Sequence, residues 1–105
     1  MLNPNLPDPN LLKTVLEPLL EDFQYWFARS LTLLENEDIS FLGRDGQADL
    51  VSRLQTAQQE VSTAQMLLKV TDGQAGVEME VLMPWHKLLT ECWQVSMRFR
   101  RENSV

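Results

Sequence analysis

The middle of the chain carries a narrow apolar stripe at helical spacing. Between Asp49 and Val70 there is no proline or glycine, and apolar or small residues recur in alternating steps of four and three. The stripe consists of Leu50, Leu54, Ala57, Val61, Ala64 and Leu68. This spacing holds one face of an α-helix, and the opposite face is polar. We therefore expect an amphipathic helix whose apolar side needs a cover.

Two further segments have the same period and supply large side chains. The first apolar face, within 10–35, consists of Leu16, Leu20, Phe23, Phe27, Ser30 and Leu34, widened by Leu19, Trp26 and Leu33. The second, within 84–101, consists of Trp85, Leu88, Leu89, Cys92, Trp93, Val95, Ser96 and Phe99. The alanines of the middle stripe leave room for such rings. The pattern predicts an all-α fold, a small antiparallel bundle of three main helices organised around the middle one.

Prolines, glycines and an aspartate set the expected helix boundaries. An internal proline costs about 3 kcal/mol in an unbroken helix. At Pro18 we therefore expect a short helix to end near Leu16 and a longer one to restart after a kink. A second kink is expected near Pro84. Asp45 is the expected N-cap of the middle helix, and Gly73 suits its C-terminal cap.

The connecting segments carry two further expectations. Ile39, Phe41 and Leu42 are expected to insert into the core as a one-turn plug. Residues 77–83 alternate apolar and polar side chains except at Leu82, which is typical of a strand, yet they also fit helical spacing. No other segment resembles a partner strand, and a lone strand leaves its backbone groups unpaired. We therefore prefer a helix here.

The domain organisation is simple. Three prolines among Asn and Asp residues predict an extended arm over residues 1–9. We expect residues 10–101 to form a single helical-bundle domain and residues 102–105 to form a frayed end. A chain of 105 residues suits one hydrophobic core.

Charge and targeting signals narrow the class of protein. The formal net charge is −6 at pH 7, which disfavours nucleic-acid binding. The arginines Arg98, Arg100 and Arg101 fit the last turn of a helix, where cations complement its dipole. There is no signal-peptide pattern, and no apolar run approaches the roughly 20 residues of a membrane span. One cysteine suits a reducing compartment, so we expect a cytoplasmic protein without a transmembrane segment.

The polar residues do not form a recognisable catalytic set. The single histidine, His86, and the single cysteine, Cys92, lie about 240° apart around a helix, so they cannot form a dyad. One of each also excludes the usual transition-metal sets. Lys87 and Glu91 are spaced as a surface ion pair. The remaining acids read as solvated surface: Glu17, Glu21, Asp22, Glu35, Glu37 and Asp38. We expect no catalytic residue, no metal and no cofactor, and thus no enzyme.

The aromatic residues are more informative than the polar ones, because they exceed what one core face can bury. Tyr25, Trp26 and Phe27 are consecutive and span about 200° of helix surface, so all three cannot face one core. Trp85 and Trp93 lie near a face that leucines already fill. Either the bundle has a tryptophan-rich core, or some rings remain at the surface as anchors for a partner. The candidate partner-binding residues are Tyr25, Trp26, Trp85, His86 and Trp93.

Two strings resemble a known family. LLKTVLEPLLEDFQYWFARS (residues 11–30) and LMPWHKLLTECWQVSMRFR (residues 82–100) look like a family of short cyanobacterial proteins with no assigned function. With the middle helix, the likeness covers about residues 11–101. The resemblance implies a cytoplasmic protein of a photosynthetic bacterium and carries over no catalytic residue.

Two functional hypotheses follow from these observations. The first is a non-enzymatic protein-interaction module, self-associating as a homodimer or binding another protein. The alternative is a helical bundle that binds an apolar small molecule or pigment-like ligand, in space left by Ala57 and Ala64 opposite the large rings.

Overall fold

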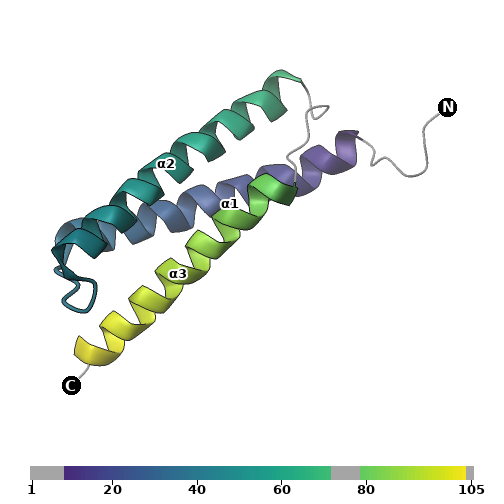
Figure 1. Ribbon diagram of the computed structural model, residues 1–105. Helices are drawn as coiled ribbons and strands as arrows, with labels where there is room; N and C mark the ends of the chain where they lie inside the picture. Colours follow the sequence, from purple (N-terminus) through teal and green to yellow (C-terminus); the bar gives the residue numbers. More distant parts are fainter. Residues whose placement is uncertain (1–8, 72–78, 104–105) are drawn as a thin grey trace.

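The computed structural model describes residues 9–71 and 79–103 of the chain. This part consists of three helices: α1 (Pro9–Asn36), α2 (Gly43–Val70) and α3 (Met79–Asn103). Figure 1 shows α1 and α2 as an antiparallel pair, with α3 running in the same general direction as α1. No strand occurs among the described residues. The all-α fold and the small three-helix bundle are thus confirmed.

The first helix, not the middle one, lies closest to both of the others. The backbone of α1 approaches α2 most closely and α3 next, whereas α2 and α3 remain further apart. Gln24 of α1 reaches α2, where its amide donates to the Gln58 carbonyl (3.0 Å) and to the Ser62 hydroxyl (2.8 Å). Side-chain hydrogen bonds join α2 to α3, from Trp85 to Glu60 and from Arg53 to Glu91. The expected organisation around the middle helix is therefore wrong.

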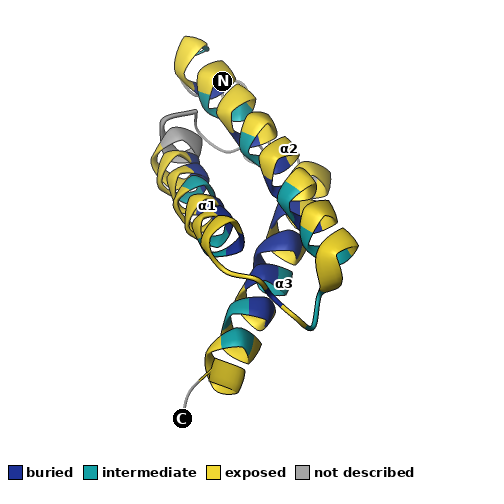
Figure 2. Ribbon diagram, turned by 90° about the vertical axis from the view of Figure 1, so that its left-hand side faces the viewer, coloured by how far each residue is buried: buried dark blue, intermediate teal, exposed yellow. Residues whose placement is uncertain are grey.

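The buried residues follow the predicted periods. Of the middle stripe, only Ala64 is half-buried and the other five residues are buried. Figure 2 shows the buried bands of the helices facing the space that the helices enclose. Among the side chains described, the buried ones are Leu16, Leu20, Phe23, Phe27, Leu31 and Leu34 in α1 and Trp85, Leu88, Leu89, Cys92 and Val95 in α3. Leu31 is the one member of these sets that the sequence pattern missed.

Neither proline divides its helix. Pro18 lies inside α1 and Pro84 inside α3, and each helix continues through its proline. The predicted break near Leu16 is therefore wrong, and kinks at the two prolines are not confirmed. Both prolines are exposed. Because each ring lies on the solvent side, the lost backbone bond is local and the buried face keeps its packing.

The α1–α2 connection confirms the predicted plug but not the predicted cap. Ile39 is 1% exposed, and Phe41 and Leu42 are half-buried against the core. The helix α2 begins at Gly43, whose φ of 73° favours glycine. Asp45 lies within the first turn of α2 instead of capping it. There its carboxylate still faces the positive end of the helix dipole.

The other boundaries differ from expectation by a few residues. The helix α2 ends at Val70, and Thr71 donates its backbone N–H to the Leu67 carbonyl at 3.0 Å. Gly73 and residues 1–8 of the expected arm lie outside the described residues, whereas Pro9, the last residue of that arm, already belongs to α1. The helix α3 starts at Met79, so residues 79–83 are helical as preferred, and it continues to Asn103, two residues beyond the predicted end of the domain.

Candidate protein-interaction surface

Trp85 is a core residue. It is 2% exposed, and its ring packs edge-on against Phe23 with 5.8 Å between centroids. The indole N–H donates to the Glu60 carboxylate on α2 at 3.2 Å. Trp85 is among the partner-binding residues predicted from the sequence, but the structure places its ring inside the bundle. Phe27 is likewise fully buried.

The other three candidate rings form one exposed cluster, which we call the aromatic cluster: Tyr25, Trp26 and Trp93. They are 53%, 36% and 41% exposed, respectively. Trp26 of α1 meets Trp93 of α3 edge to face, with centroids 5.8 Å apart and planes at 90°. Tyr25 packs edge-on against Trp26 at 5.1 Å. The cluster therefore links α1 to α3 at the surface, and its rings hold one another in place.

Arg29 holds one side of the aromatic cluster. Its guanidinium lies 5.7 Å from the ring centroids of both Tyr25 and Trp26. It also donates to the Tyr25 hydroxyl at 3.0 Å. A cation over aromatic rings contributes about 0.5–1 kcal/mol at an exposed site. The arginine thus fixes the orientation of two exposed rings.

Further exposed apolar side chains extend this surface along both helices. Val15 lies eleven positions before Trp26, and Met97 lies four positions after Trp93, so each is on the side of its helix that carries the cluster. Both are exposed. We call the surface formed by the aromatic cluster, Val15 and Met97 the α1–α3 face. It holds five of the ten large apolar side chains that the described part of the chain exposes.

A hollow lies on each side of the Trp26–Trp93 pair. The larger, of about 300 Å³, is lined by Trp26, Arg29, Ser30, Leu33, Trp93, Ser96, Phe99 and Arg100. The smaller, of about 180 Å³, is lined by Leu19, Asp22, Phe23, Trp26, His86, Leu89 and Trp93. His86 is exposed at this second hollow, as the sequence predicted for a surface residue. The tryptophan pair therefore stands as a wall between two depressions.

The groove between α2 and α3 is closed at one side by an ion pair. Arg53 donates two hydrogen bonds to the Glu91 carboxylate, at 2.7 and 2.9 Å, and one to Asp49 at 2.9 Å. The expected pairing of Glu91 with Lys87 is wrong, because this bidentate geometry fits the planar guanidinium better. The bond to Arg53 lowers the pKa of Glu91, and the same bond raises the pKa of Arg53. Beside the pair, a groove of about 440 Å³ is lined by residues that include Ala57 and Trp85.

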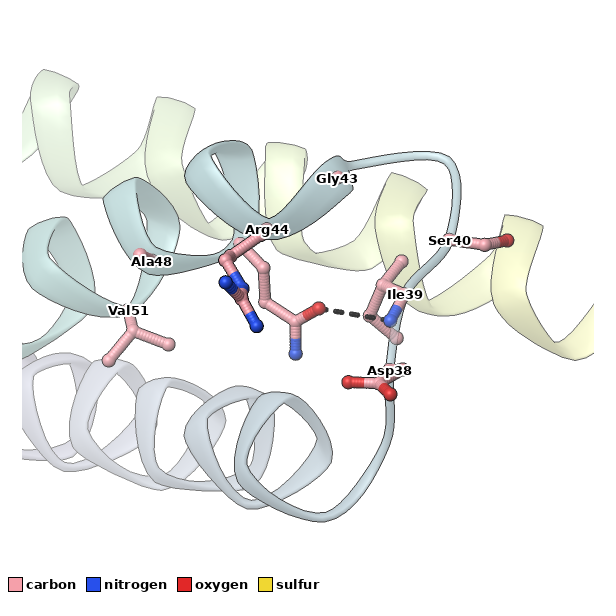
Figure 3. Close-up of a pocket in the computed structure, with 8 residues that line it drawn as sticks. Asp38, Ile39, Ser40, Gly43, Arg44, Ala48 and Val51 are labelled. Atoms are coloured by element: carbon pink, nitrogen blue, oxygen red, sulfur yellow. Dashed lines mark hydrogen bonds between the residues drawn. The ribbon is translucent and has the colours of Figure 1, made fainter.

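A third hollow, at the α1–α2 turn, is organised by Gln47. Figure 3 shows the side chains of Arg44 and Asp38 directed toward this space of about 580 Å³. The Gln47 amide accepts from the Ile39 backbone N–H at 3.0 Å and donates to the carbonyls of Leu34 at 2.7 Å and Glu37 at 2.8 Å. Those bonds close the turn at the end of α1. This role of Gln47 could not be predicted from the sequence, because a lone glutamine has no recognisable motif.

The cysteine and the acidic residues considered in the sequence do not come together as a catalytic or metal site in the described part of the chain. Cys92 is buried, and burial raises the pKa of its thiol, with an opposing effect of Ser30. The acids that the sequence marked as solvated are exposed. Within residues 9–71 and 79–103, no three His, Cys, Asp or Glu side chains are grouped as metal ligands would be. None of the helices in that part is sufficiently long and apolar to span a bilayer.

Fold and surface together define a small three-helix bundle with an exposed aromatic face. The family described as "Protein of unknown function (DUF2605)" matches residues 6–101. The chain therefore belongs to this family. Comparison with curated proteins and with solved structures gave no significant match.

Proposed function

We propose that this protein is a non-enzymatic interaction module that binds another protein chain through the α1–α3 face. The observation that carries the proposal is the aromatic cluster, in which three large rings contact one another while remaining between 36% and 53% exposed. Tryptophan, tyrosine and arginine are the residues most enriched among binding hot spots. All three types meet here at the junction of two helices.

Preorganisation supports the same proposal. Binding is weakened when mobile side chains must be ordered, at about 0.5–1.5 kcal/mol for each immobilised side chain. Trp26 is already held by Tyr25, Trp93 and Arg29 before any partner arrives. The rings therefore lose little freedom on binding, and their remaining exposed area is available to stabilise a complex.

The non-enzymatic part rests on the titratable residues. The sequence holds one histidine and one cysteine. His86 is exposed, whereas Cys92 is buried with a raised thiol pKa, which is unfavourable for a nucleophile. A cytoplasmic location in a cyanobacterium remains part of the proposal, on the sequence composition and on the resemblance of residues 11–30 and 82–100.

The proposal is tested by affinity capture from an extract of the source organism, with the tagged protein as bait. Wild type, Trp93→Ala and Met66→Ala are compared, because Met66 is exposed on α2 away from the α1–α3 face. We expect a stoichiometric protein, either a partner or the untagged chain itself, with wild type and Met66→Ala but not with Trp93→Ala. Equal recovery with all three baits contradicts the proposal, provided that circular dichroism shows all three to be folded.

The groove beside Ala57 supports a second candidate function, binding of an apolar small molecule. Its volume of about 440 Å³ falls in the range of small-molecule sites, and Trp85 and Leu88 contribute to its lining. The purified protein would then carry absorbance beyond its own aromatic band. A protein-only spectrum, together with no small molecule in the mass spectrum of the eluate, contradicts this candidate.

A further inference from the structure

We propose that the partner that covers the α1–α3 face is a second copy of this chain, bound antiparallel about a two-fold axis. This inference rests on the proposed function and names its partner. In a two-fold pair the same surface is used twice, so every feature that protrudes must meet a complementary feature of the same face. The α1–α3 face meets this condition in both shape and charge.

The shape is self-complementary. The Trp26–Trp93 wall adjoins the hollow of about 300 Å³. The lining of this hollow runs from Trp26 to Leu33 on α1 and from Trp93 to Arg100 on α3, so its middle lies three to four positions past the wall on each helix. An axis placed between the wall and this hollow exchanges the two features. The tryptophan pair of each copy then enters the hollow of the other, and both walls are covered.

The same register opposes two unpaired charges. Asp22 lies four positions before Trp26, and Arg100 lies seven positions after Trp93. The midpoint between Asp22 and Arg100 is about one and a half positions past the wall, close to the midpoint between the wall and the middle of the hollow. In such a pair α1 stacks on the partner's α1, but Asp22 and Arg100 both line hollows at the seam between α1 and α3. Asp22 of one copy therefore comes close to the partner's Arg100 across this seam, and the pair forms twice. Within the described part of the chain, neither residue has an ion-pair partner.

Charge also selects the antiparallel direction. Arg29 and Arg100 both line the larger hollow, so one end of the face is basic, whereas Asp22 lies at the other end. A parallel pair gathers both arginines of both copies at one end, where like charges repel. The antiparallel pair places each basic end against an acidic end.

The size of the face predicts a weak dimer. From Val15 to Leu33 the face is about 27 Å long at 1.5 Å per residue. Two helices with axes about 9 Å apart and side chains on either side are roughly 20 Å wide. Each copy then buries roughly 500 Å², a total near the lower limit of specific interfaces, so we expect a micromolar dissociation constant.

A charge exchange tests this arrangement, with the full chain studied by sedimentation equilibrium across the micromolar range. Asp22→Arg and Arg100→Asp place like charges together twice in each dimer. We expect each to raise the dissociation constant about tenfold. The double variant restores opposite charges and is expected within about threefold of wild type. Glu21→Arg makes the same charge change at an exposed residue outside the face and is expected to leave the constant unchanged.

Two results overturn the inference. The first is a wild-type chain that stays monomeric throughout the range, and the second is a double variant that dimerises no better than the single variants. If the chain is monomeric while Trp93→Ala still abolishes capture of another protein from the extract, the proposed function stands and only the self-pairing is wrong. If Trp93→Ala leaves both capture and sedimentation unchanged, both proposals are contradicted.

Discussion

Replacing Trp85 by alanine will destabilise the protein far more than the same replacement of Trp93. Trp85 is 2% exposed and packs against Phe23, so its removal leaves a cavity in the core. Such a change costs about 3–5 kcal/mol. The whole chain is expected to have roughly 5–15 kcal/mol of folding free energy. Loss of Trp85 therefore removes a large fraction of the stability.

Replacing Trp93 by alanine should lower the free energy of unfolding less than replacing Trp85. The Trp93 ring is already 41% exposed in the folded protein, and it packs edge to face against the exposed ring of Trp26. Since full burial of a large apolar side chain contributes about 1.5–3 kcal/mol, the replacement of Trp93 should cost about 2 kcal/mol or less. The difference between the two alanine variants is thus about 2 kcal/mol.

The assay is urea unfolding followed by far-ultraviolet circular dichroism, which remains a valid probe when a tryptophan is removed. Trp85→Phe serves as the matched control, because it keeps a ring in the core and loses the N–H that donates to Glu60. We expect it to cost less than Trp85→Ala. Equal destabilisation by Trp85→Ala and Trp93→Ala would refute the reasoning, because Trp93 would then support the core instead of the surface.

Three further predictions concern the polar contacts and the thiol. Because Arg53 lowers the pKa of Glu91 below its ordinary value of 4.5, their pair stabilises the fold above that pH and is lost as the pH falls through the folded-state pKa. Glu91→Gln should therefore cost up to about 1 kcal/mol at neutral pH and nothing in strong acid, by urea unfolding at each pH; a constant difference contradicts this. Gln47→Ala should cost about 1–3 kcal/mol, and Gln47→Glu should not rescue it in thermal unfolding, because a carboxylate cannot donate to the Leu34 carbonyl. Cys92 should react with a thiol reagent only on unfolding, and rapid labelling of the native protein would contradict its burial.

The helices and the core could be predicted from the sequence because burial repeats with the helical period. The middle stripe follows directly from this period, and the plug follows from the three apolar residues Ile39, Phe41 and Leu42 in the connecting segment. The break at Pro18 could not be judged, since it depends on whether the ring faces solvent or a neighbouring helix. Residues near the ends of α2 and α3 were misplaced because caps depend on local backbone geometry.

The candidate surface was predicted only in part. Trp85 and Trp93 are eight positions apart and differ by about 80° around the helix, and this angle places one in the core and the other at the edge with α1. Spacing within one segment cannot show which edge meets a neighbour. For the same reason Glu91 was assigned to Lys87, four positions away, instead of to Arg53, 38 positions away on another helix.

The most direct test of the interaction surface is a fluorine NMR spectrum of the protein labelled with 5-fluorotryptophan, recorded free and in the complex or at high concentration. The three resonances are assigned with single Trp→Phe variants. We expect those of Trp26 and Trp93 to shift on association, whereas that of the buried Trp85 stays in place. Association without any shift of Trp26 and Trp93 would show that the protein binds through a different surface.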